Sequence, residues 1–188
     1  MKDYYQENAK EYIGKTMNAD MSFFYSKFEE RLHPGSNILD LGFGSGRDSL
    51  YFLSKGYGVY SLDPCQAFIE HGKEIGLPHV MQASSEDLDL NDAFDAIWAN
   101  ASLLHVASSK LKCVFLRCAK AIKEGGIMYC SFKYGGFEGE RDGRYYVDLT
   151  EETITKYIGN EFEIEETFIS SDSLGRGNKW LNVLLKKR

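Results

Sequence analysis

The sequence has no long hydrophobic run, no excess of basic residues and few prolines, and each absence excludes a class of protein. None of its apolar runs approaches the ~18–20 residues that cross a bilayer, which argues against a transmembrane helix. Its 188 residues carry 22 basic and 28 acidic side chains, so the net charge is −6. A general nucleic-acid binder needs a positive surface, so we expect no nucleic-acid partner. Only three prolines occur, and we find no linker between domains.

Cysteine and histidine are also scarce. The four cysteines form no CxxC pair, and the four histidines are too scattered for a zinc motif. The N-terminal segment MKDYYQENAKEY is polar and has no signal-peptide core, which favours a reducing compartment. We therefore expect a cytoplasmic protein with reduced cysteines, no metal site and no membrane partner, as a monomer or a homodimer.

The length of the chain fits one domain, and we expect residues 1–188 to form it. Apolar residues at helical spacing predict helices at 3–13 and 22–32, so that residues 1–35 form a helical cap or lid. Beyond them, short apolar runs alternate with amphipathic segments. The predicted strands are 37–41, 58–62, 79–82, 93–99 and 126–133, and the predicted helices are 48–55, 66–75 and 109–123.

Strands that alternate with helices predict right-handed crossovers and a parallel sheet. The last part of the chain differs, because a helix opens at Thr150 and two strands at 162–170 and 179–186 follow as a hairpin. The predicted fold class is therefore α/β. We expect a doubly wound, mostly parallel seven-stranded sheet with an antiparallel C-terminal strand and helices on both faces.

The segment ILDLGFGSGRD (38–48) runs from a strand through three alternating glycines into a helix. Glycine permits the close approach of a ligand, and the helix N-terminus offers free N–H groups, although NAD-, FAD- and nucleoside-binding sheets all share such loops. Asp63 ends the next strand, where it either accepts the ribose hydroxyls or caps the helix that Pro64 would begin. Asp40 lies in an apolar run and either stabilises the loop or contacts the ligand.

These and later motifs closely resemble the class I S-adenosylmethionine-dependent methyltransferases. ILDLGFGSGRD resembles the cofactor glycine motif, VYSLDPC (59–65) the ribose-binding strand end, and ASSEDLD (83–89) the adenine-side loop. FDAIWANASLLHV (94–106) and IKEGGIMYCSFKYG (122–135) resemble the fourth and fifth strands. YYxxNAxxY (4–12) and EGERDGRYYVDLT (138–150) are similar to small bacterial methyltransferases of tellurite-resistance-like or ubiquinone-biosynthesis-like type.

The resemblance implies a Rossmann-like methyltransferase fold and the cofactor S-adenosylmethionine, which leaves as S-adenosylhomocysteine. It implies that Asp63 holds the ribose and that the Asn100 main chain lies beside the sulfonium or the amino-acid tail. The residues implied to bind the cofactor are Tyr12, Asp40, Gly42, Phe43, Gly44, Gly46, Asp63, Pro64, Ser84, Ser85, Glu86 and Asn100. Phe43 stands where the family has a small residue or cysteine, and Ser84 where it often has an aspartate, which predicts modest cofactor affinity.

Methyl transfer from a sulfonium is an in-line displacement, which needs alignment and water exclusion but a base only where the acceptor loses a proton. Among the residues after the parallel strands, His105 is the candidate general base because histidine titrates near neutral pH, and a structural role is the alternative. Tyr4, Tyr5 and Tyr12 form either a lid over the cofactor or a core-facing stripe.

The loops above the site contain the cations and tyrosines Arg141, Arg144, Tyr145, Tyr146, Arg176 and Lys179. We expect a small-molecule acceptor whose anionic group, a carboxylate or a phosphate, binds Arg144, Tyr145, Arg176 and Lys179. Ordinary surface charge is the alternative. The predicted function is methyl transfer to this acceptor, and the rival hypotheses are a nicotinamide-dependent oxidoreductase and a non-catalytic cofactor-binding regulatory module.

Overall fold

The computed structural model of the chain describes residues 2–188, so Met1 of the predicted cap lies outside the described residues. The helices are α1 (Lys2–Thr16), α2 (Ser22–Glu29), α3 (Arg47–Ser54), α4 (Gln66–Glu74), α5 (Ser108–Ala121) and α6 (Glu151–Ile158). The strands are β1 (Asn37–Leu41), β2 (Gly58–Asp63), β3 (Val80–Gln82), β4 (Phe94–Ala99), β5 (Ile122–Lys133), β6 (Glu138–Arg141), β7 (Arg144–Val147), β8 (Phe162–Ser171) and β9 (Lys179–Lys187). Short 3₁₀ turns occupy Ser85–Asp87 and Leu103–His105.

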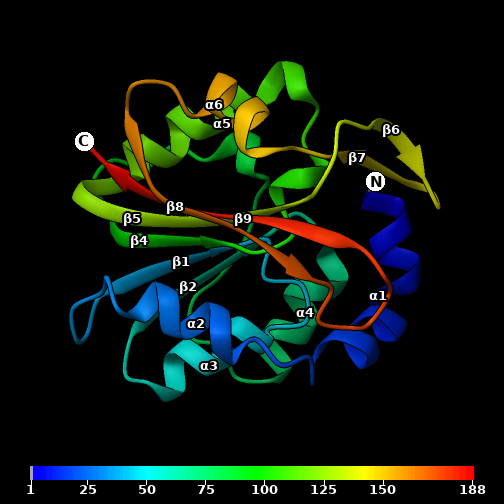
Figure 1. Cartoon of the computed structure of the whole chain (residues 1–188). Coiled ribbons are helices and arrows are strands. Elements are labelled where there is room, and N and C mark those ends of the chain that lie inside the picture. The colour runs from blue at the N-terminus through cyan, green and yellow to red at the C-terminus, as the bar shows by residue number, and fades with distance from the viewer. Residues whose placement is uncertain (1) are drawn as a thin grey trace.

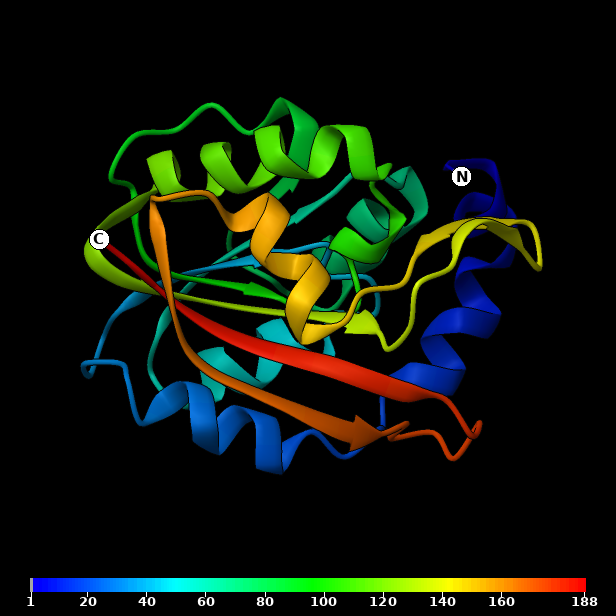
Figure 2. The same cartoon turned by 45° about the horizontal axis from the view of Figure 1, so that its top comes forward.

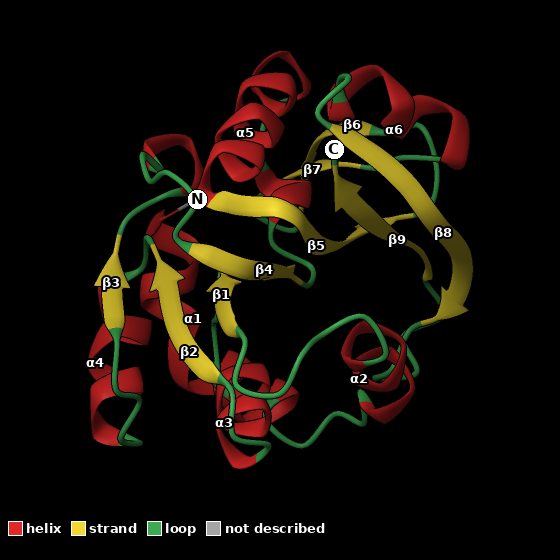
Figure 3. Ribbon diagram, turned by 90° about the vertical axis from the view of Figure 1, so that its left-hand side faces the viewer, coloured by secondary structure: helices red, strands yellow, loops and turns green. Residues whose placement is uncertain are grey.

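Seven strands form one twisted sheet in the order β3-β2-β1-β4-β5-β9-β8 (Figure 3). The strands β1 to β5 pair in parallel, whereas β9 runs antiparallel to both β5 and β8. Helices α5 and α6 lie on one side of the sheet and α2 and α3 on the other (Figure 1). The predicted fold class, with its antiparallel C-terminal strand and helices on both faces, is confirmed.

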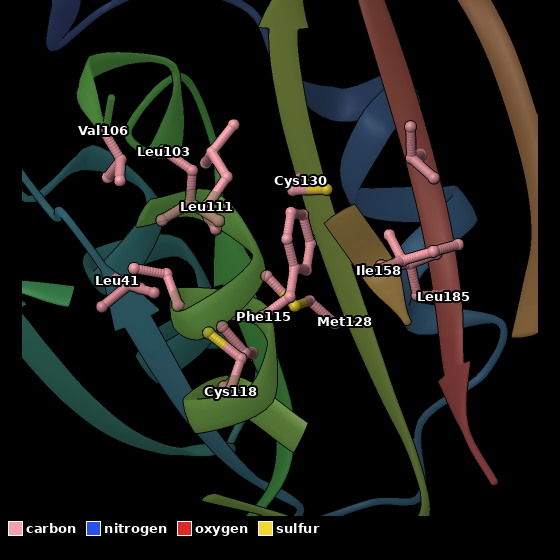
Figure 4. Packing of buried hydrophobic residues seen from close by; sticks show 14 of the residues in the cluster. Leu41, Leu103, Val106, Leu111, Phe115, Cys118, Met128, Cys130, Ile158 and Leu185 are labelled. Atoms are coloured by element: carbon pink, nitrogen blue, oxygen red, sulfur yellow. The ribbon is translucent and has the colours of Figure 1, made fainter. Parts of the chain in front are cut away.

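Two apolar layers enclose the sheet. On one face Phe115 of α5 packs in the same cluster as Met128 of β5 (Figure 4). On the other face the rings of Phe28 in α2 and Phe52 in α3 lie 5.0 Å and 5.3 Å from that of Trp98 in β4. Because both faces of the central strands are covered, these strands appear in the sequence as continuous apolar runs. This core holds the loops at the ends of the strands in fixed positions.

The predicted cap at residues 1–35 divides into two helices with different surroundings. Helix α2 belongs to the core, because Phe24, Tyr25 and Phe28 are buried against the sheet. Helix α1 instead stands beside the β6–β7 hairpin, at the edge where the parallel strands end (Figure 2). Helix α1 therefore lies in a position to cover a site at that edge. No helix within residues 2–188 is both long and apolar enough to cross a membrane.

One predicted boundary differs between α5 and β5. The sequence predicts a helix that continues to residue 123, with Glu124-Gly125-Gly126 as its stop, but α5 ends at Ala121 and β5 begins at Ile122. The pairing with β4 shifts there, because Phe94 lies opposite Ile122 and Ala96 opposite Ile127. The two glycines therefore belong to an irregularity in β5. Since helix ends and strand bulges both use glycine, the sequence does not distinguish them.

A second difference concerns residues 134–148, which the sequence presents as a loop. Strands β6 and β7 form a hairpin within this segment. Its turn is Asp142-Gly143, where both residues have positive φ angles of 50° and 71°. An Asp-Gly pair is typical of a tight hairpin turn, so this pair is the signal in the sequence that could have predicted the hairpin. The hairpin matters because it forms a wall of the site.

Candidate active site

Two cavities lie at the edge of the sheet where the parallel strands end. The larger has a volume of about 350 Å³ and is bounded by α1, the glycine loop, the β6–β7 hairpin and the β8–β9 turn. The smaller has a volume of about 120 Å³ and is lined by Pro64 and residues 84–86. Both cavities are lined by Gly42 and His105, so they adjoin at these two residues.

The glycine loop fits tightly between its neighbours. Gly42 has a φ of +83°, and a Cβ on it would lie 2.5 Å from the Cβ of Ser102. Gly44 has a φ of +51°, and a Cβ there would lie 3.1 Å from Cε1 of Tyr12. Any side chain at Gly42 would collide with Ser102, so this position requires glycine. Phe43 lines the larger cavity, whereas Gly44 and Gly46 line neither.

Asp63 is buried directly behind the glycine loop. Its Oδ2 accepts a hydrogen bond from the Gly44 N–H at 3.1 Å, and its Oδ1 accepts one from the Cys65 N–H at 2.9 Å. Burial raises the pKa of this carboxyl to about 6, although both N–H donors lower it. Because α4 begins at Gln66 with Cys65 as its N-cap, the alternative role of Asp63 as helix cap is not observed.

Asp40 lies away from both cavities. Its Oδ2 accepts a hydrogen bond from the Ser49 hydroxyl at 2.6 Å, and that hydroxyl lies 2.7 Å from Oγ of Ser61. Burial, together with the nearby charge of Asp48, raises the pKa of Asp40 well above its ordinary value. The donor is thus a serine of α3 rather than the glycine loop, and Asp40 connects β1 with α3 and β2.

Asp48, the second residue of α3, organises the floor of the larger cavity. Arg47 donates to its two oxygens at 2.7 Å and 2.9 Å, and Trp98 Nε1 donates at 2.9 Å. Tyr25 and Asn100 also donate to this carboxylate. Burial would raise the pKa of Asp48, but the arginine and the other donors lower it overall. The network fixes Asn100, which lines the larger cavity as predicted.

His105 stands at the junction of the two cavities. Its Nδ1 lies 2.6 Å from the Tyr145 carbonyl oxygen, so this nitrogen carries a proton and donates it. The Tyr5 hydroxyl then donates to the Nε2 lone pair at 2.8 Å. Burial lowers the pKa of His105 to about 4, which differs from the near-neutral value that the residue type suggested. The imidazole is therefore neutral at pH 7.

The tyrosines of α1 lie at the larger cavity. Tyr5 and Tyr12 line it, and their rings lie 5.9 Å and 5.4 Å from that of Phe68 in α4. The Tyr4 ring lies 4.7 Å from Cζ of Arg144 in the hairpin. Tyr5 and Tyr12 also pack against a small apolar cluster that includes Phe43 and Phe68, so these side chains show features of both the lid and the core-facing stripe.

The structure brings together only part of the predicted acceptor group. Arg144 and Arg176 line the larger cavity, but Tyr145 and Lys179 do not. The Tyr145 hydroxyl donates to Glu138 at the surface at 2.7 Å, and Lys179 is exposed at the start of β9. Side chains alternate along a strand, so Tyr146 faces the cavity where Tyr145 faces away.

Many lining residues lie outside the predicted set, and three of them carry polar groups at positions that matter for a ligand. Lys133 is the last residue of β5, and the rule that ligands bind beyond strand ends could have indicated it. Trp180 lines the larger cavity, and its Nε1 donates to Asp172 at 3.1 Å. Ser102 lines the smaller cavity, and no pattern in the sequence indicates its role.

Comparison with known proteins gives one family model, described as a methyltransferase domain, which matches residues 39–130. This match covers 92 of the 188 residues. An uncharacterized methyltransferase of Synechocystis sp. is 28% identical over 112 residues, which cover 53% of this chain and 52% of that protein. The chain thus spans about half the length of this curated relative.

Solved structures share the fold of the whole chain. The 1,6-didemethyltoxoflavin-N1-methyltransferase of Burkholderia thailandensis, solved with S-adenosylhomocysteine, has a TM-score of 0.80 and 19% identity, covering 98% of this chain and 84% of that one. An S-adenosylmethionine-dependent methyltransferase of Methanosarcina mazei has a TM-score of 0.76 and 19% identity, covering 87% and 97%. The comparisons confirm the predicted resemblance to class I S-adenosylmethionine-dependent methyltransferases.

The methyltransferase domain match covers only one side of the site. It includes the glycine loop, Asp63, residues 84–86 and Asn100, and it ends at Cys130. Lys133, Arg144 and the β8–β9 turn lie beyond it. The β6–β7 hairpin and the β8–β9 turn, which form walls of the larger cavity, are therefore outside the part of the chain that the family model describes.

Proposed function

We propose that the protein is an S-adenosylmethionine-dependent methyltransferase acting on a small-molecule acceptor, with residues 1–188 as one domain and α1 as its lid. The observation that carries this proposal is the junction of the two cavities at Gly42 and His105. The smaller cavity is lined by residues 84–86, which resemble an adenine-side loop, and the larger by Asn100. Two adjoining cavities of this kind suit a cofactor that has a nucleoside at one end and a sulfonium at the other.

The residues present fit this cofactor. Ser102 Oγ is buried at the smaller cavity and has no hydrogen-bond partner among the side chains that the structure describes or the backbone of residues 2–188, so its hydroxyl is free for a nucleoside. Each Asp63 oxygen accepts one backbone N–H, and a carboxylate oxygen can accept a second donor. Asp63 therefore retains capacity for ribose hydroxyls. Pro64, Ser84, Ser85 and Glu86 would border the base, and Tyr12, Phe43 and Asn100 the methionine end.

The bound cofactor supplies an electrophilic methyl group, and the chain aligns the acceptor and excludes water. Tyr5, Tyr12 and Phe68 cover the site against solvent. Where the acceptor loses a proton, His105 Nε2 is the atom that takes it, once Tyr5 releases its hydrogen bond. A base whose pKa is about 4 is weak, so this role suits an acceptor whose proton is already acidic.

Thermal denaturation with ligands tests the cofactor assignment. S-adenosylhomocysteine at ~100 times its Kd should stabilise the protein by about 2.7 kcal/mol, whereas NAD should not. Asp63→Asn should remove most of this stabilisation, because an amide accepts the ribose hydroxyls less well. Asp95→Asn is the matched control, since Asp95 also accepts a backbone N–H, from Asn37 at 2.8 Å, but lies at the start of β4, at the opposite end of the strand from Asn100.

Three outcomes contradict parts of the proposal. Stabilisation by NAD and not by S-adenosylhomocysteine would establish the oxidoreductase hypothesis instead. An unchanged shift in Asp63→Asn would remove the ribose assignment. Incubation with methyl-labelled cofactor and a metabolite extract tests catalysis directly, and binding without any labelled small molecule would favour the non-catalytic module.

A further inference from the structure

The larger cavity has a surplus of positive charge although the chain as a whole has a net charge of −6. Its lining includes the cations Arg47, Lys133, Arg144 and Arg176 and the carboxylates Asp48, Asp142 and Asp172. Two of the cations are neutralised, because Arg47 pairs with Asp48 at 2.7 Å and Arg176 with Asp172 at 2.8 Å. Their charges serve internal ion pairs rather than a ligand.

Lys133 and Arg144 have no such partner. Neither lies within 4.0 Å of a carboxylate oxygen of residues 4–188, the part of the chain whose side chains the structure describes, and exposed Asp142 pairs with no cation of that part. Arg144 Nε is also buried without a hydrogen-bond partner among the described residues. Burial lowers the pKa of Lys133, and repulsion by Arg141 and Arg144 lowers it further, against the opposing effect of Asp148. Positive charge is therefore concentrated here, and neither cation forms an ion pair with a described side chain.

Both free cations lie against one aromatic ring. Lys133 Nζ lies 4.2 Å and Arg144 Cζ 5.3 Å from the centre of the Tyr146 ring. Arg141 lies 4.7 Å from the same ring, but its guanidinium pairs with Asp148. A ring face attracts a cation only weakly and cannot neutralise two of them, so a ligand that supplies negative charge would complete this arrangement.

We propose that Lys133 and Arg144 bind an oxyanion, a carboxylate or a phosphate, on the methyl acceptor. The proposal rests on the proposed function and deepens it by naming a substrate class. The same cavity is lined by the apolar or aromatic side chains of Leu104, Tyr129 and Trp180, which suit an aromatic or apolar body attached to the anion. The two cations lie beyond the matched domain and line only the larger cavity, so they are separate from the nucleoside side.

Titration calorimetry with benzoate, benzamide and inorganic phosphate tests this site. The protein is first saturated with S-adenosylhomocysteine, so the carboxylate of the cofactor is already in place, and ionic strength is held constant. At least one oxyanion should bind tenfold or more tightly than neutral benzamide, which has the shape of benzoate. The comparison of benzoate with phosphate identifies the preferred oxyanion.

Variants assign the binding to the cation pair. Lys133→Gln should weaken oxyanion binding about tenfold, and Lys133→Arg, which keeps the charge, should largely restore it. Lys179→Gln is the matched control, because Lys179 is an exposed cation on the neighbouring strand that does not line the cavity. It should leave oxyanion binding unchanged.

The proposal is overturned if neither oxyanion binds more tightly than benzamide, or if Lys133→Gln and Lys179→Gln have equal effects. It is also overturned if Lys133→Gln weakens the binding of S-adenosylhomocysteine by as large a factor as the binding of the oxyanion, because the two cations would then serve the cofactor. Failure of the wild-type protein to bind S-adenosylhomocysteine contradicts the proposed function instead. In that case the same oxyanion titrations without it still decide whether Lys133 and Arg144 form an anion site.

Discussion

Asp48 is the residue on which the floor of the site depends. Its carboxylate accepts hydrogen bonds from Tyr25 of α2, Arg47 of α3, Trp98 of β4 and Asn100 just after β4. A buried carboxylate is stable only when its lone pairs are satisfied, and here the donors come from three elements and the loop after β4. The position of Asn100 at the cavity therefore follows from this buried network.

Replacement of this carboxylate should be costly. Asp48→Asn leaves the Arg47 guanidinium buried without a counter-charge, so we expect the free energy of unfolding to fall by about 3–5 kcal/mol. Urea denaturation at pH 7 measures the change. Asp40→Asn is the control, because the pKa of Asp40 is raised by burial and an amide resembles its protonated form. A loss in Asp48→Asn no larger than that in Asp40→Asn would contradict this account.

At the scale of elements, α1 and α2 differ in how they are attached. Helix α2 contributes three buried aromatic residues to the core. Helix α1 is held by few polar contacts: Tyr5 bonds to His105, Gln6 Oε1 accepts the Ala67 N–H at 3.1 Å, and Arg47 donates to the Thr16 carbonyl at 3.2 Å. The apolar contacts of α1 are to a small cluster with Phe43 and Phe68 that is separate from the two clusters enclosing the sheet, so α1 can open without disturbing the main core, which is what a lid requires.

Hydrogen exchange followed by mass spectrometry tests this lid. In the ligand-free protein the amides of α1 should exchange at least tenfold faster than those of α2, because α1 can open without unfolding the core. Bound S-adenosylhomocysteine should slow exchange in α1 and leave α2 nearly unchanged. Equal protection of both helices without ligand would show that α1 is part of the core and not a lid.

The sequence predicts the elements of the sheet better than the walls of the site. Strand β1 has its predicted bounds, because a strand buried on both faces must be a short apolar run. The residues proposed to bind the cofactor can be located in the same way, since the glycine loop comes directly after the apolar run of β1 and Asp63 ends that of β2. The acceptor side depends on the register of the β6–β7 hairpin, which decides that Tyr146 faces the cavity and Tyr145 does not. A one-residue change of register reverses these faces, and local sequence does not specify it.

For the molecule as a whole, two buried groups give the stability opposite dependences on pH. The folded-state pKa of Asp63 is raised to about 6, so its contribution is greatest in acid and is lost as pH rises through 6. The folded-state pKa of His105 is lowered to about 4, below its ordinary 6.5. The contribution of His105 is therefore fully present above pH 6.5 and is lost as pH falls toward 4. The two effects partly cancel between these limits.

A paired comparison isolates the histidine from this cancellation. His105→Gln removes the titrating imidazole and leaves Asp63 in place, so the difference in unfolding free energy between wild type and variant reports His105 alone. Between pH 7.5 and pH 4.5 this difference should shift against the wild type by about 2 kcal/mol, because unfolding lets the buried neutral ring take up a proton. Urea denaturation of both proteins at the two pH values measures it.

The variant Tyr5→Phe should keep this dependence of stability on pH, since burial is the main cause of the lowered pKa of His105. A difference that is the same at both pH values would show that His105 titrates as a solvated histidine, and its assignment as a neutral base at the cavity junction would then fail.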